Sequence, residues 1–167
     1  MITLYHGSNV AVDMPKILPN LRALDFGCGF YLTSSYAQAE RWAKLVFKRR
    51  QQGQAIINIY SFDEERAIAL NLMHFENANA DWLEFVVNNR KALKLFDFDI
   101  VIGPVANDAT LPVIDDYMDG RYTQEEAVRR LLPQNLTDQY AFCSEISLGY
   151  LTYQGSKIVW TLYQRER

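Results

Sequence analysis

Two short apolar segments bordered by glycine constrain the fold more than any other feature of this chain. The first is Leu4-Tyr5-His6-Gly7-Ser8. The second, about twenty residues further on, is Gly27-Cys28-Gly29-Phe30-Tyr31-Leu32-Thr33. Short apolar runs bounded by turn residues are typical of buried strands. We therefore expect a fold that opens with two short strands, separated by a loop that contains Pro15 and Pro19.

Helical and strand patterns alternate along the rest of the chain. Ser34 or Ser35 is expected to cap a helix that runs to about Gln51, because apolar residues recur there every three or four positions. Further helices are expected at residues 81–95, 110–118 and 125–132, and further strands at 55–62, 99–102, 139–143 and 151–153. Residues 67–75 and 157–163 fit either a strand or a helix. The pattern predicts one mixed α+β domain over residues 1–167.

The composition is that of a soluble globular protein. The chain has 167 residues, of which 49% are hydrophobic and 22% are charged, and its net charge is −3. This charge gives no overall attraction to nucleic acid or to anionic membranes. Four cations gather near the end of the first helix, and we interpret them as a solvated helix end: Lys44, Lys48, Arg49 and Arg50.

The sequence also indicates where the protein acts. Cys28 and Cys143 do not form the even-numbered framework of a small secreted protein, which favours a reducing compartment. The first residues lack the basic and apolar regions of a signal peptide, and no apolar run reaches the length of a membrane span. We therefore expect a cytoplasmic protein without membrane association.

The two opening segments resemble the first two signature strands of ADP-ribosyltransferases, in the branch similar to poly(ADP-ribose) polymerases. The resemblance implies a split β-sandwich, in which two small sheets surrounded by helices form a cleft for NAD. It also implies NAD as co-substrate, without a metal. In such enzymes the histidine, here His6, bonds a ribose hydroxyl, while the backbone of the next glycine, Gly7, binds the nicotinamide amide. Ser8 lies close by.

The second motif implies further contacts to NAD. Tyr31 takes the position of the tyrosine that stacks on the nicotinamide ring, and Thr33 ends the same segment. Trp42, eleven residues after Tyr31, matches a second aromatic residue on the other ring face, although it also fits the apolar stripe of its helix. We expect Arg22, in the loop between the motifs, to bind the pyrophosphate.

The third motif departs from the family pattern. It normally contains a glutamate at the start of a late strand, and the matching run here is Asp138-Gln139-Tyr140. Gln139 can bond a ribose hydroxyl, but it carries no charge and cannot act as a base. This favours a single transfer over polymer elongation. Glu145 is an alternative acid, and Ala39 stands where the family often has an amide-binding serine.

Four separated runs resemble one bacterial family more closely, the uncharacterised-domain family numbered 3990, regarded as ADP-ribosyltransferase-like toxins. These runs lie within residues 25–33, 81–90, 99–108 and 138–140. In the third run, Asn107 or Asp108 either contacts a ligand or begins the next helix. The resemblance implies a toxin of a toxin–antitoxin module, hence a small protein antitoxin as partner.

We expect a mono-ADP-ribosyltransferase, a glycosyltransferase whose catalytic residues are His6, Tyr31 and Gln139. The acidic composition favours a protein over a nucleic acid as acceptor. Two alternatives remain: an NAD glycohydrolase that uses the same site, and a catalytically degenerate domain that binds NAD, ADP-ribose or a partner. An RNA 2′-phosphotransferase shares the fold, but the basic residues that its pocket requires are not evident.

Overall fold

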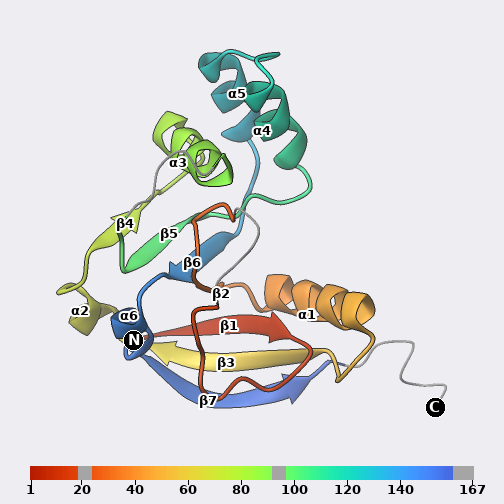
Figure 1. Ribbon diagram of the computed structural model, residues 1–167, viewed down its shortest axis with the longest axis vertical. Coiled ribbons are helices and arrows are strands. Elements are labelled where there is room, and N and C mark those ends of the chain that lie inside the picture. The colour runs from red at the N-terminus through yellow and green to blue at the C-terminus, as the bar shows by residue number, and fades with distance from the viewer. Residues whose placement is uncertain (19–23, 92–96, 160–167) are drawn as a thin grey trace.

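The computed structural model describes residues 1–18, 24–91 and 97–159. Among these residues the chain forms two small β-sheets with helices packed on their outer faces (Figure 1). The protein is therefore an α+β protein, as predicted. No helix in the described ranges is long and apolar enough to cross a membrane.

The first sheet contains three antiparallel strands in the order β1-β3-β7. These are β1 (Ile2–Ser8), β3 (Ile56–Phe62) and β7 (Leu151–Ile158). Helix α1 (Tyr36–Arg50) covers one face of this sheet. Its buried Ala39 and Ala43 pack with Ala55 and Ile57, and such small side chains allow the helix to approach the strands closely.

The second sheet has the order β2-β6-β5-β4. Its strands are β2 (Phe30–Leu32), β6 (Asp138–Phe142), β5 (Ile100–Pro104) and β4 (Leu72–His74). Within this sheet, only the β4–β5 pair is parallel. Three helices lie above the second sheet in Figure 1: α3 (Ala80–Arg90), α4 (Leu111–Met118) and α5 (Gln124–Leu131). Two single-turn helices, α2 (Glu64–Ala67) and α6 (Glu145–Leu148), lie at the opposite end.

Strand alternation divides the core into an inner layer between the sheets and outer layers beneath the helices. The inner layer joins Leu4, Tyr60 and Phe62 of the first sheet to Phe30 and Phe142 of the second. Tyr31, the middle residue of β2, points to the opposite face of the sheet from Phe30 and packs in the outer layer under α3. The inner and outer faces of the second sheet are thus distinct environments.

Trp82 is the largest fully buried side chain and ties α3 to the second sheet. Its indole Nε1 donates a hydrogen bond of 3.0 Å to the carbonyl oxygen of Pro104, where β5 ends. Two of the runs noted in the sequence, 81–90 and 99–108, therefore meet through a structural contact. The interpretation of Trp82 as a core residue is confirmed.

We expect Trp82→Phe to lower the free energy of unfolding by about 2 kcal/mol, because the buried Pro104 carbonyl loses its donor and the smaller ring leaves a void. Urea unfolding monitored by circular dichroism measures this change. Trp42→Phe is the matched control, since Trp42 is 48% exposed and its replacement should alter stability by less than about 0.5 kcal/mol. Equal effects of the two substitutions would contradict the assigned role of Trp82.

Most expected elements occur with shifts of one or two residues. Ser35 caps α1 through a bond of 3.2 Å from the amide of Gln38, as the sequence predicts. The ambiguous segment 67–75 divides into the end of α2, a turn and β4. The final strand is longer than expected because β7 continues to Ile158. The expected ends of the 81–95 helix and of the 157–163 segment fall partly outside the described residues.

Candidate functional site

The candidate site lies where strands β1 and β2 separate. They are joined by one isolated bridge: the amide of Tyr5 donates to the carbonyl of Thr33 over 2.8 Å, and the amide of Thr33 donates back over 3.0 Å. Backbone groups two residues apart on a strand point to the same side. The N–H and C=O groups of Gly7 therefore point toward β2, as those of Tyr5 do, but no backbone bridge forms there within the described chain. The sheet is split at Gly7.

His6 occupies the inner side of this split. Its ring packs on Phe30, with 4.4 Å between the ring centroids, and its Nδ1 lies 2.7 Å from the carbonyl oxygen of Tyr31. A carbonyl oxygen can only accept, so Nδ1 must carry the proton and Nε2 must carry a lone pair when the ring is neutral. No described residue donates to Nε2. The backbone of Tyr31 thus orients His6 as a hydrogen-bond acceptor.

Burial keeps His6 neutral. It lowers the pKa of the imidazole below 6.5, and the hydrogen bond to the Tyr31 carbonyl opposes this only in part. Below pH 6.5 the unfolded chain therefore binds a proton that the folded chain does not, and the free energy of unfolding falls as the pH is lowered from 6.5 toward the pKa of the folded state. NMR titration of the His6 ring should give a midpoint below 6.5. A midpoint above 6.5 would contradict a half-buried ring that the protein keeps neutral.

Gly7 is glycine for a packing reason. A methyl group built at Gly7 would overlap the carbonyl oxygen of Ala39 and would lie 2.7 Å from the amide nitrogen of Ala43. The backbone of α1 therefore lies directly on this residue. One side of Gly7 packs against the helix, and its N–H and C=O face the split. A larger side chain at this position would therefore disturb the packing of α1 next to the backbone groups of the candidate site.

Tyr31 lies on the other face of the split from His6. Its ring packs beside the outer core, and its hydroxyl donates to the carbonyl of Gly27. Burial is the main cause that raises the pKa of this hydroxyl above 10, with the nearby Cys143 adding to it. Tyr31 is therefore a protonated donor at neutral pH. It fixes the loop that leads into β2.

Helix α3 holds the same loop in place. Arg90 Nε donates to Asp25 over 2.6 Å, and the side-chain amide of Asn89 donates to the Asp25 carbonyl over 3.2 Å. Asp25 and Arg90 are both less than one fifth exposed, so this ion pair is more shielded from water than the surface pairs. The prediction that Arg90 is structural is confirmed.

Gln139 lies on β6 opposite Gly103 of β5, and on the same face of the sheet as Tyr31. Its side-chain nitrogen is buried without a hydrogen-bond partner among the described residues. Buried amide groups are normally satisfied, and an unsatisfied one costs about 1–3 kcal/mol. An orphaned donor beside the split is the arrangement expected of a residue whose partner is a ligand.

Asp138 joins the start of β6 to the end of β2, and sequence reasoning did not give it a role. Its carboxylate accepts from the Thr33 hydroxyl over 3.1 Å, from the Ser34 amide over 2.8 Å and from the Ser34 hydroxyl. These bonds place Gln139 next to the split. In the sequence, Asp138 is marked only by its position next to Gln139. That position does not identify its two partners, which lie more than a hundred residues away.

Trp42 lies on a flank of α1. Tyr36, six residues earlier, faces the first sheet: its ring packs edge-on against Tyr5 of β1, with 5.3 Å between the ring centroids, and the Lys157 ammonium of β7 lies 6.0 Å from its centroid. Six residues turn a helix by about 600°, which sets Trp42 about 120° from Tyr36 and therefore to the side of the helix. Trp42 is 48% exposed, with the Arg49 guanidinium 5.6 Å from its ring centroid.

The remaining candidates have mixed positions. Ser8 is buried at the end of β1, and Thr33 is tied to Asp138 beside Gln139. Arg22 lies outside the described residues. Glu145 is exposed at the start of α6, beyond the far end of β6 from Gln139, which argues against its being the missing acid. Asn107 accepts from the amides of Ala109 and Thr110, so it forms the turn before α4.

The two sheets, the split between β1 and β2 and the site within it define the protein as an α+β domain with a candidate ligand site at a strand edge. A family model matches residues 2–153, and the chain belongs to that family, which is described as protein of unknown function (DUF3990). No curated protein and no solved structure matches the chain.

Proposed function

We propose that this protein is a mono-ADP-ribosyltransferase, which cleaves NAD and transfers ADP-ribose to a macromolecular acceptor through a split-sandwich fold of the ADP-ribosyltransferase type. The observation that carries the proposal is the open split between β1 and β2. There His6 offers a lone pair at Nε2, and Gly7 offers an N–H and a C=O that have no backbone partner among the residues the structure describes. These are the groups that a nicotinamide riboside requires.

The nicotinamide carboxamide has one acceptor oxygen and one NH₂ donor, so the N–H and C=O of Gly7 complement it. Tyr31 of β2 and Trp42 of α1 are the two aromatic rings that we assign to the faces of this electron-poor cationic ring. His6 Nε2 accepts a hydrogen bond from a ribose hydroxyl. Because its low pKa keeps the ring neutral, no positive charge repels the cationic substrate.

The reaction breaks the bond between C1″ of the ribose and the ring nitrogen of nicotinamide. The electron pair of this bond leaves with nicotinamide and neutralises it, and positive charge develops on the ribose, as in glycoside cleavage. His6 and Gln139 hold the ribose in the reactive geometry. Since Gln139 is neutral, the acceptor must be nucleophilic without help from this residue, which favours a single transfer.

The family resemblance extends the proposal to the biological role. We propose a bacterial toxin that acts in the cytoplasm and is neutralised by a small antitoxin protein. Growth after induced expression tests this role: wild-type protein should arrest growth, and Tyr31→Ala should not. Normal growth with well-expressed, folded wild-type protein would argue against a toxin.

The activity is tested by incubating purified protein with NAD labelled in its ADP-ribose part, together with a bacterial lysate. Nicotinamide release is measured by chromatography and labelled products by mass spectrometry. The proposal predicts release together with labelled macromolecules, and loss of both in Tyr31→Ala and Gln139→Ala. Free ADP-ribose as the sole product would indicate a hydrolase instead. NAD binding without nicotinamide release would indicate a degenerate binding domain.

A further inference from the structure

The outer face of α1 concentrates positive charge in an otherwise acidic chain. The helix carries five cations and one acid, whereas the whole chain has a net charge of −3. Only Lys48, Arg49 and Arg50 lie in the last turn, where the helix dipole favours cations. Arg41 and Lys44 lie in the middle of the helix. A solvated helix end therefore does not account for the whole set.

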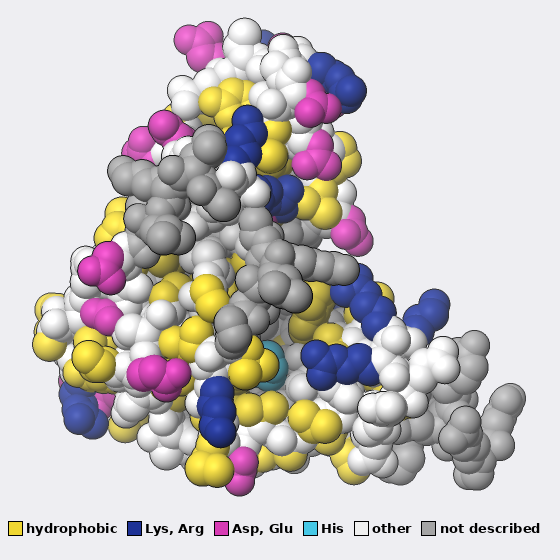
Figure 2. All heavy atoms as spheres, viewed as in Figure 1, with side chains coloured by type: hydrophobic (Ala, Val, Ile, Leu, Met, Phe, Trp, Pro, Cys, Tyr) yellow, Lys and Arg dark blue, Asp and Glu magenta, His cyan; other side chains and the backbone are white. Residues whose placement is uncertain are grey.

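Several of these cations are available to a ligand. Lys44 pairs with Glu40 over 2.5 Å, and Arg50 donates to the Asn9 side chain over 3.1 Å. Arg41 and Lys48 are exposed and have no acid within ion-pair distance in the described part of the chain. They are seven residues apart, about 10 Å along the helix axis. Figure 2 shows the blue side chains over α1 at the edge of a notch below the α4–α5 end.

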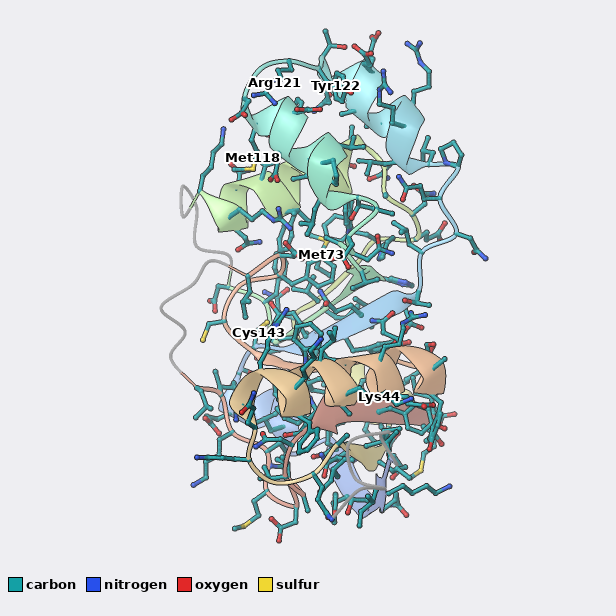
Figure 3. The ribbon with its side chains drawn as sticks, turned by 90° about the vertical axis from the view of Figure 1, so that its right-hand side faces the viewer. Lys44, Met73, Met118, Arg121, Tyr122 and Cys143 are labelled. Carbon is teal, nitrogen blue, oxygen red and sulfur yellow. The ribbon has the colours of Figure 1, made fainter. Side chains whose placement is uncertain are left out.

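An exposed aromatic ring stands beside these cations. Trp42 is 48% exposed, and the Arg49 guanidinium lies 5.6 Å from its ring centroid. Leu45, 43% exposed, separates Arg41 from Trp42 and Arg49 on the helix surface. Figure 3 looks onto this face, on which Lys44 is labelled. A flat ring beside a cation suits a nucleotide, whose base stacks on the ring while its phosphate binds the cation.

We propose that the outer face of α1, defined by Arg41, Trp42, Lys48 and Arg49, binds single-stranded nucleic acid. If the proposed function holds, a nucleic acid strand is then the acceptor class, because the helix that carries these cations packs directly on Gly7 through Ala39 and Ala43. An acidic peptide would use the cations but would leave the exposed Trp42 ring without a stacking partner. The overall charge, which favoured a protein acceptor, does not reveal this local distribution.

The neutral Gln139 agrees with this class of acceptor. A terminal phosphate oxygen or a ring nitrogen of a base has a lone pair available at neutral pH. Its electron pair forms the new bond to C1″ while the pair of the old bond leaves with nicotinamide. No proton has to be removed before attack, so the reaction does not require a carboxylate at position 139.

Binding is tested without NAD, by fluorescence anisotropy of labelled 20-nucleotide RNA and DNA single strands at two salt concentrations. The double variant Arg41→Ala/Lys48→Ala should bind about tenfold more weakly, with a smaller salt dependence. Lys16→Ala/Arg129→Ala removes the same charge from exposed positions outside α1 and should bind as the wild type does. Absence of wild-type binding, or equal losses in the two double variants, would overturn the proposal. So would tighter binding of polyglutamate, which would indicate an acidic protein partner.

A second experiment separates this inference from the proposed function. Wild-type protein is incubated with labelled NAD and the same strands. If the wild-type protein labels the nucleic acid and the Arg41→Ala/Lys48→Ala variant labels it less, the result supports both the transferase activity and the binding of nucleic acid by α1. Binding through α1 without any NAD cleavage leaves the docking face intact and refutes the transferase. Label on lysate proteins alone, with added strands unlabelled, supports the transferase and overturns nucleic acid as its acceptor.

Discussion

Replacement of His6 by alanine is expected to lower NAD cleavage at least about 100-fold. The variant loses the Nε2 lone pair that we assign to a ribose hydroxyl, and removal of one preorganised hydrogen-bonding group from an active site typically costs a factor of about 10²–10³. It also loses the bond from Nδ1 to the Tyr31 carbonyl, which joins β1 to β2 in addition to the Tyr5–Thr33 bridge. The measurement is the initial rate of nicotinamide release at saturating NAD.

His6→Asn separates chemistry from structure. The side-chain nitrogen of asparagine can take the place of Nδ1 and donate to the Tyr31 carbonyl, but no acceptor stands at the position of Nε2. We expect this variant to unfold at nearly the wild-type temperature and to remain as inactive as His6→Ala. Recovery of activity in His6→Asn would mean that His6 only joins the strands. Full activity in both variants would remove His6 from the site.

Local patterns in the sequence predicted the elements that depend on local chemistry. The Ser35 cap and the spacing of Ala39 and Ala43 predict α1, because capping and helical periodicity act within a few residues. The glycines at 27 and 29 likewise mark the turn before β2, where Gly27 has a φ of 84°. His6, Tyr31 and Gln139 were found because each belongs to a short motif.

The order of the strands and the supports of the site could not be read in the same way. That β6 lies beside β2 depends on pairing between residues more than a hundred positions apart, such as Phe30 and Phe142. The hydrogen bonds that Thr33 and Ser34 donate to Asp138, and the ion pair of Arg90 with Asp25, also join distant segments. A single charged residue in a sequence carries no mark of its partner, and only the fold brings the two together.

Replacement of Gly7, which packs against α1 on one side, is expected to have the largest effect on stability. Gly7→Ala should lower the free energy of unfolding by about 3 kcal/mol, because the added methyl group meets backbone atoms of Ala39 and Ala43 rather than flexible side chains. To accommodate it, α1 must move away from β1. Urea unfolding at pH 7.5 measures the loss.

The movement of α1 also connects stability to the site. Trp42 lies on α1, and the polar groups of Gly7 face the split, so a displaced helix should weaken NAD binding in whatever fraction of Gly7→Ala remains folded. Gly149→Ala is the matched control: Gly149 has a φ of −65°, and an added methyl group would lie 3.2 Å from the nearest atom, the Ile146 carbonyl oxygen. We expect the control to change stability by less than about 1 kcal/mol. Equal stability of Gly7→Ala and wild type would show that α1 does not rest on β1 as closely as described, and the assignment of Gly7 and Trp42 to one site would then fail.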